Sequence, residues 1–157
     1  MTPAQYFNEI ALPTVQEFKK DRQSRRHAYL ACIAVFHVMN YLAEARSEKK
    51  AKTVQDIVKA DLGESFHVVR VVCNSAKHLR LDDKHEIEFR SGDDWSRPAA
   101  RAGQAIAGLS RIGDQNGDRE FQFKNRRYGI YACIRRILIS YEKKFPSHFA
   151  GCDFSAI

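Results

Sequence analysis

One segment of the sequence places basic and polar residues at helical spacing inside a run rich in valine. The residues are His67, Arg70, Asn74, Lys77 and His78. At 100° per residue, Arg70 would lie about 60° from His67 around a helix axis, and Asn74 about 20°. These side chains therefore form one polar stripe on an otherwise apolar helix. Because a buried polar group needs a hydrogen-bond partner, a protein group or a ligand must face the stripe.

The residue types of this stripe suit proton transfer and phosphate binding. A histidine such as His78 exchanges protons near neutral pH, and Asn74, one turn or about 6 Å away, can orient it or a substrate. Arg70 lies about 12 Å from His78 along the axis, so these two side chains cannot bond directly. Arginine and lysine bind phosphate well. The predicted catalytic residues are His78, Asn74 and Arg70, and the predicted substrate-binding residues begin with Lys77 and His67.

A second polar stripe lies on the longest apolar segment. His37, Asn40, Tyr41 and Glu44 have the spacing i, i+3, i+4, i+7, which places them on one helix face. If the two helices pack antiparallel, the two stripes face each other across one cleft. These four residues are then predicted to contact the substrate as well.

Two other interpretations of the stripes stay open. In the first, the polar side chains satisfy one another and fix the register of the two helices. In the second, His37 and His78 bind a divalent ion together with Glu44 or His67. The sequence has neither an HExxH motif nor a compact cluster of histidine and cysteine. We therefore predict no metal and no cofactor.

Apolar periodicity predicts the helices that position these residues. They cover residues 2–12, which Pro13 ends or kinks, and then 14–21, 25–45, 54–62, 64–79 and 127–145. Side-chain caps are predicted at the helix starts, from Thr2, Thr14, Ser24 and Thr53. Gly63 is predicted to end the fourth helix.

The hydrophobic pattern of the sequence changes at Asp82, where the spacing of apolar residues falls from about 3.6 residues, as in a helix, to 2, as in a strand. Residues 86–89 and 120–123 alternate as strands do, residues 105–112 suggest a further strand, and Asn116-Gly117 is typical of a hairpin turn. We predict a single mainly α domain over residues 1–157. It is a helical bundle of four or five helices with a small β-hairpin insert at about residues 82–124.

The composition bounds the class of protein. Its 157 residues are 44% hydrophobic, enough for a core that needs no metal or disulfide. None of the four cysteines forms a CxxC pair, and Cys32, Cys73 and Cys133 lie in apolar segments, which predicts buried, reduced thiols. The net charge of +7 favours anionic partners, nucleic acid first, although the basic clusters are scattered.

No segment is typical of a secretory signal or a membrane span. The longest uncharged run, residues 27–43, contains two histidines and an asparagine, which favours a buried core helix. We therefore expect a cytoplasmic protein with no membrane partner.

Residues 70–78, with their Asn-x-x-Lys-His core, resemble the HEPN (higher eukaryote and prokaryote nucleotide-binding) superfamily and related uncharacterised bacterial helical families. The resemblance covers residues 24–81 and 127–145 and omits the insert. It implies a helical bundle, usually a homodimer, that binds RNA. Several members are metal-independent endoribonucleases of toxin–antitoxin or phage-defence systems, which implies an antitoxin-like protein partner. The family motif has four to six residues between arginine and histidine, whereas Arg70 and His78 are separated by seven.

Other HEPN-like domains are inactive binding modules. The alternative function is therefore a non-catalytic helical interaction module. A metal-dependent enzyme built on His37, Glu44 and His78 is the third candidate.

Overall fold

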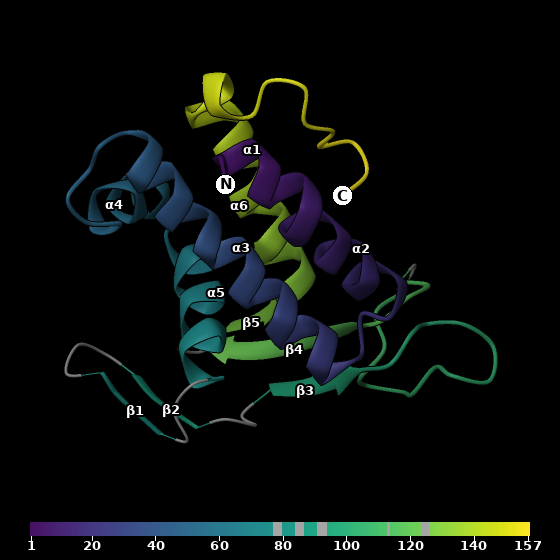
Figure 1. Ribbon diagram of the computed structural model, residues 1–157. Coiled ribbons are helices and arrows are strands. Elements are labelled where there is room, and N and C mark those ends of the chain that lie inside the picture. Colours follow the sequence, from purple (N-terminus) through teal and green to yellow (C-terminus); the bar gives the residue numbers. More distant parts are fainter. Residues whose placement is uncertain (77–79, 84–86, 91–93, 113, 124–125) are drawn as a thin grey trace.

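The computed structural model describes residues 1–76, 80–83, 87–90, 94–112, 114–123 and 126–157, and its helices outweigh its strands (Figure 1). The helices are α1 (Pro3–Tyr6), a π-helical turn (Phe7–Ala11), α2 (Leu12–Lys20), α3 (Arg25–Ala45), α4 (Lys52–Leu62), α5 (Glu64–Ser75), α6 (Ile130–Lys144) and a final 3₁₀ turn (Pro146–His148). The strands are β1 (Arg80–Asp83), β2 (Ile87–Arg90), β3 (Asp94–Arg97), β4 (Asp118–Phe123) and β5 (Arg126–Gly129). The mainly α fold with a small β insert is confirmed.

Two of the predicted helix starts are confirmed. The Thr2 hydroxyl accepts from the Gln5 backbone N–H at 3.1 Å, and the Gln5 side chain accepts from the Thr2 N–H at 2.8 Å. The Ser24 hydroxyl accepts from the backbone N–H of His27 at 3.3 Å and caps α3. Each cap satisfies a backbone donor that the first helical turn leaves without an intrahelical acceptor.

Other predicted boundaries are wrong. The chain continues from α1 into α2 through Pro13, because the wider π turn before it accommodates the proline ring at the start of α2. Thr14 forms no capping box and instead donates its hydroxyl to the carbonyl of Ile10 at 2.6 Å. Helix α4 begins at Lys52 without a side-chain cap, so Thr53 lies inside it, whereas Gly63 ends it with a φ of 51° as predicted.

Helix α3 occupies the middle of the helical layer, with α1 and α2 on one side, α5 on the other and α6 behind (Figure 1). It is long and apolar enough to cross a membrane, but 56% of its most apolar window is buried inside the protein, as in a core helix. The Tyr141 hydroxyl of α6 donates to the carbonyl of Val35 at 2.9 Å, and the rings of Phe36 and Phe66 join α3 to α5. This core holds the two helices that carry the predicted stripes.

The strands form two antiparallel sheets at one end of the helices. Strands β1 and β2 pair with each other, and β4 lies between β3 and β5. The register pairs Trp95 with Glu120 and Glu120 with Gly129. The prediction that the last helix opens at residue 127 is wrong, because residues 127–129 belong to β5 and α6 begins at Ile130.

The connection between β3 and β4 covers residues 98–117 and differs from the prediction. Residues 105–112 form turns, not a strand, with the Leu109 and Ser110 backbone N–H groups both donating to the carbonyl of Ile106. Three large aliphatic side chains there are exposed, so no sheet neighbour covers them: Ile106, Leu109 and Ile112. Asn116-Gly117 ends this long connection, with a φ of 68° at Gly117 that favours glycine.

The cysteines match the prediction. Cys32, Cys73 and Cys133 are buried, and all four cysteines are free thiols. Burial raises the pKa of the Cys133 thiol to about 11 and that of Cys32 well above its usual value. These thiols are therefore protonated at neutral pH and act as small core side chains.

Candidate functional site

Helix α5 presents one narrow polar stripe at its surface. Its partly exposed residues are Glu64, His67, Arg70 and Asn74, and every other residue of the helix is buried. Their spacing of three, three and four residues keeps them on one face. The structure thus places three of the predicted site residues together, and it adds Glu64 at the start of the same stripe. Lys77 and His78 lie outside the described residues.

The first half of this stripe contacts the three-stranded sheet. The His67 ring stacks on Phe123 of β4, with centroids 6.0 Å apart and planes 15° from parallel. The Tyr128 hydroxyl of β5 donates to Oε2 of Glu64. Burial and the neighbouring Glu64 carboxylate raise the pKa of Tyr128. These contacts fix the position of α5 on the sheet. Arg70 and Asn74 lie further along the helix, in the direction of its C-terminal end.

The second predicted stripe, on α3, also reaches the surface. His37 and Tyr41 are partly exposed, whereas Asn40 and Glu44 are exposed. The Tyr41 ring stacks on Tyr6 of α1 at 4.3 Å between centroids, so this residue faces α1. Helices α3 and α5 pack side by side (Figure 1). A cleft shared by the two stripes stays a prediction.

The metal-binding interpretation gains no support from the described part of the chain. No three histidine, cysteine, aspartate or glutamate side chains there lie close enough together to hold a metal ion. The predicted trio of His37, Glu44 and His78 includes a residue outside that part, so this alternative also stays a prediction.

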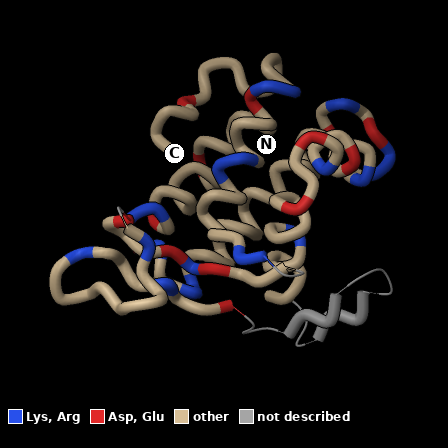
Figure 2. Tube along the Cα trace, turned by 180° about the vertical axis from the view of Figure 1, so that it is seen from behind, with Lys and Arg blue, Asp and Glu red and all other residues tan. Residues whose placement is uncertain are grey.

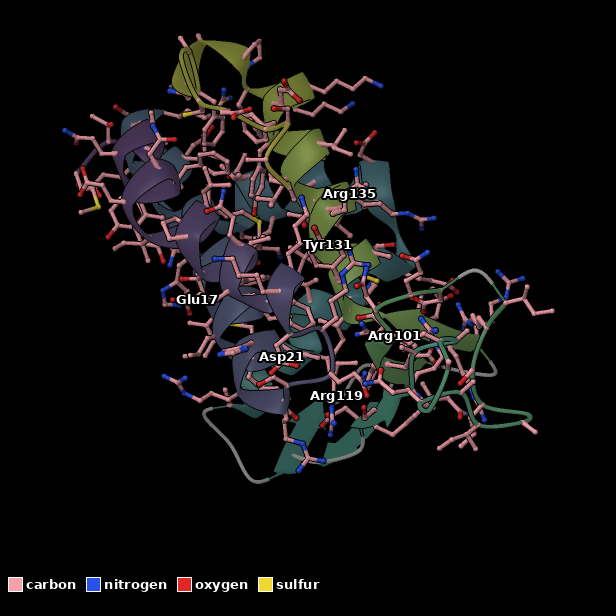
Figure 3. All side chains as sticks on the ribbon, turned by 90° about the vertical axis from the view of Figure 1, so that its right-hand side faces the viewer. Glu17, Asp21, Arg101, Arg119, Tyr131 and Arg135 are labelled. Atoms are coloured by element: carbon pink, nitrogen blue, oxygen red, sulfur yellow. The ribbon has the colours of Figure 1, made fainter. Side chains whose placement is uncertain are left out.

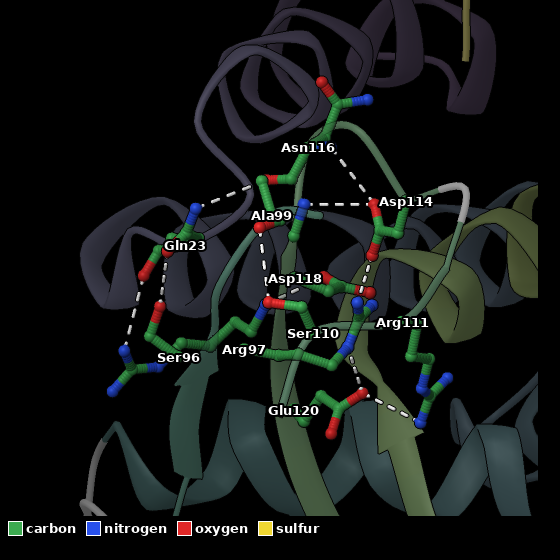
Figure 4. Close-up of polar contacts among 12 residues, drawn as sticks. Gln23, Ser96, Arg97, Ala99, Ser110, Arg111, Asp114, Asn116, Asp118 and Glu120 are labelled. Atoms are coloured by element: carbon green, nitrogen blue, oxygen red, sulfur yellow. Dashed lines mark hydrogen bonds and ion pairs between the residues drawn. The ribbon is translucent and has the colours of Figure 1, made fainter. Parts of the chain in front are cut away.

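A buried cluster of charged side chains, which the sequence did not predict, surrounds the base of the β3–β4 connection (Figure 4). Glu120 of β4 is fully buried, and its Oε1 accepts from Nε of Arg97 at 2.6 Å and from Arg111 at 2.9 Å. Arg97 also donates to the Asp114 carboxylate. The Asp114 Oδ1 accepts in turn from the backbone N–H of Gly117 at 3.0 Å. These four residues, Arg97, Arg111, Asp114 and Glu120, form the charge cluster. It binds the β3–β4 connection to the sheet.

A second ion group joins the sheet to the start of α3. Asp94 of β3 is buried and accepts from Arg119 and from the Tyr29 hydroxyl, the latter at 3.0 Å. Arg25 approaches the same carboxylate at 3.3 Å. Arg119, labelled in Figure 3, also donates to the carbonyl of Gln23 at 3.3 Å, at the turn that joins α2 to α3. The alternation of acidic and basic residues in β4, Asp118-Arg119-Glu120, was the available signal, because strand neighbours point to opposite faces.

Asp118 supports the start of α6 from the neighbouring strand. Its carboxylate accepts from the Arg119 backbone N–H at 2.8 Å and from the backbone N–H of Tyr131, in the first turn of α6. Gly129, the residue before the helix, has no side chain to do this. A Cβ atom at Gly129 would lie 2.2 Å from Oδ2 of Asp118, so only glycine leaves room for the carboxyl group.

The burial of Asp118 predicts a dependence of stability on pH. Burial raises the pKa of this carboxyl from 3.8 to about 7, against the lowering effects of the backbone hydrogen bonds and Arg97. The folded protein therefore keeps a proton that the unfolded chain releases. This contribution to stability is complete below pH 4 and is lost as the pH rises to about 7.

Denaturant unfolding between pH 4 and 8 measures this effect. Relative to Asp118→Asn, which cannot ionise, the wild type should lose stability as the pH rises to about 7 and then level off. A difference between the two proteins that is constant over this range would show that Asp118 ionises normally in the folded state.

Exposed arginines lie close to the α5 stripe. Arg126 is exposed on β5, pairs with Phe123 in the sheet register and interacts with Tyr128, which contacts the stripe. Arg136 of α6 donates to the Ser65 hydroxyl of α5 at 3.1 Å. Figure 2 shows basic and acidic residues together along the sheet. The stripe therefore has cationic neighbours that could bind an anionic ligand.

Comparison of the chain with models of known protein families, with curated proteins and with solved structures found no match.

Proposed function

We propose that the chain is a HEPN-like, cytoplasmic RNA-binding protein, and that metal-independent cleavage of the bound RNA is its enzymatic activity. One observation carries the proposal: the only surface of the buried helix α5 is a stripe that contains His67, Arg70 and Asn74. The exposed Arg126 of β5 and Arg136 of α6 lie beside it. Phosphate contacts from arginine supply most of the affinity for nucleic acid.

Cleavage needs few protein groups, because RNA carries its own 2′-hydroxyl nucleophile. The protein must supply proton transfer and stabilise the charge that develops on the phosphate. By the resemblance of residues 70–78 to the HEPN motif, His78 transfers the proton, Asn74 orients it and Arg70 binds phosphate. An antitoxin-like protein and a second copy of the chain are the partners that fit this proposal.

A fluorescence anisotropy titration with labelled single-stranded RNA at low salt tests binding. Arg70→Ala should weaken binding and reduce the slope of log K against log salt by about 0.7, the value for one phosphate contact on a single strand. Lys143→Ala provides the matched control, because Lys143 is exposed near the end of α6 remote from the sheet (Figure 1). An equal loss of RNA affinity in the two variants would show that Arg70 does not contact the RNA.

Incubation of RNA with the protein in EDTA tests cleavage. The wild type should still cleave, and His78→Ala should abolish cleavage without loss of RNA binding. Wild-type binding without cleavage would leave an RNA-binding module, and absence of binding at low salt would sink the proposal.

The alternative is a non-catalytic interaction module, and the contacts of the stripe with the sheet favour it. His67 is stacked on Phe123 and Glu64 is bonded to Tyr128, as expected of residues that fix helix register. In that case His67→Ala should lower stability and leave any RNA affinity unchanged.

A further inference from the structure

The two faces of the three-stranded sheet differ in what covers them. Directly paired residues lie on the same face, so the register assigns Asp94, Phe121, Phe123 and Tyr128 to one face. This face packs on the helices, through the contacts of Phe123 with His67 and of Tyr128 with Glu64. The opposite face, which we call the outer face, has these residues: Trp95, Arg97, Asp118, Glu120, Gln122, Arg127 and Gly129.

Part of the outer face is closed and part is open. The charge cluster buries Arg97 and Glu120 below the β3–β4 connection. Trp95 is partly exposed, and Arg127 is exposed. The Arg127 guanidinium carbon lies 5.1 Å from the centroid of the Trp95 ring. The open part is therefore a partly exposed indole with a guanidinium over its ring.

The charge around this indole favours an anionic ligand. Glu120, which pairs directly with Trp95, is the nearest acidic residue in the register, and Arg97 and Arg111 hold its carboxylate at 2.6 and 2.9 Å. Arg111 and Arg127 keep exposed guanidinium groups. Of the two acidic residues that the register places on this face, Glu120 is paired with Arg97 and Arg111, and Asp118 is buried. The exposed charges described near the ring are therefore those of Arg111 and Arg127.

A partly exposed aromatic ring with neighbouring arginines is a combination that binds single-stranded nucleic acid. Bases stack on the aromatic face and arginines contact the phosphates, whatever the sequence. A duplex cannot use such a site in this way, because its bases are already stacked within the helix. Trp95 is the only tryptophan of the chain. In the described part of the chain, the aromatic residues of the core stack on one another and not on Trp95.

We infer that Trp95 and Arg127 form a stacking platform for one base of single-stranded RNA, with Arg127 on the adjoining phosphate. This inference rests on the proposed function, because it takes RNA as the ligand. It specifies the substrate class: single-stranded RNA that crosses the outer face of the sheet.

The intrinsic fluorescence of the wild type tests the platform, because Trp95 is its only tryptophan. A single-stranded oligouridylate of about 12 nucleotides should quench this fluorescence at low salt, with the same midpoint as an anisotropy titration. A duplex of equal length should quench less and bind more weakly. Equal binding of both forms would overturn the inference.

Variants separate stacking from folding. Trp95→Ala should weaken single-strand binding about tenfold, the effect of one lost base stack, whereas Trp95→Phe should restore most of the affinity. Phe154→Ala, which removes a partly buried aromatic residue packed on Phe7, is the control and should leave affinity unchanged. RNA binding without quenching, and without a loss in Trp95→Ala, would overturn the platform but not the proposed function. No RNA binding by the wild type would overturn both.

Discussion

Arg97→Ala should lower the free energy of unfolding by about 3–5 kcal/mol, the cost of leaving one member of a buried ion pair without its partner. The fully buried Glu120 carboxylate would then keep only Arg111, whose side chain is 56% exposed and therefore solvated. Asp114 would lose its arginine as well, so both ends of the β3–β4 connection would loosen. Urea unfolding followed by circular dichroism measures the change.

Two further variants show whether the loss comes from the buried charge. Lys144→Ala breaks a 3.5 Å pair with Asp61 in which both side chains are partly exposed, and should lower the stability far less than Arg97→Ala does. The double variant Arg97→Met, Glu120→Leu removes both charges and should recover much of the stability. A loss below about 1 kcal/mol in Arg97→Ala would mean that solvent reaches Glu120 in the folded protein.

Gly129→Ala should destabilise the protein by about 1–3 kcal/mol, the penalty for depriving a buried polar group of its hydrogen bonds. The φ of −68° at Gly129 suits alanine, so backbone strain does not contribute. The new methyl group would overlap Oδ2 of Asp118 and force that carboxyl away from the start of α6. Thermal and urea unfolding of the variant measure the loss.

A double-mutant cycle isolates this overlap. Asp118→Ala removes the carboxyl group, so Gly129→Ala should cost little in that background. The same cost in both backgrounds would show that the methyl group meets something other than Asp118.

Sequence periodicity was sufficient for the helices that bury a continuous face. The apolar spacing of residues 25–45 gave α3 both of its ends, and Ser24 gave its cap, because a local hydrogen bond and a 3.6-residue period act within the segment itself. The polar stripe of α5 was visible for the same reason. Every residue between His67 and Asn74 except Arg70 is apolar and buried.

The sheet decided what the local pattern could not. Residues 126–129 precede an apolar helix, yet they pair with β4 as β5, since hydrogen bonds to a neighbouring strand outweigh a weak local preference. Residues 105–112 have a strand-like composition, but no described strand pairs with them, and they form turns. Pairing partners distant in the sequence determine both outcomes.

The sequence by itself determined the mainly α class, the buried thiols and the place of His67, Arg70 and Asn74 on one face of α5, because each follows from side chains within one segment. Only the tertiary structure decided the burial of Glu120 between Arg97 and Arg111, the support of α6 by Asp118, and the place of Trp95 beside Arg127 on an open face. A charged residue in a strand looks solvent-exposed in sequence. Its burial depends on arginines that are distant in the sequence and that folding brings next to it. The two-residue alternation of a strand does not indicate which distant residues these are.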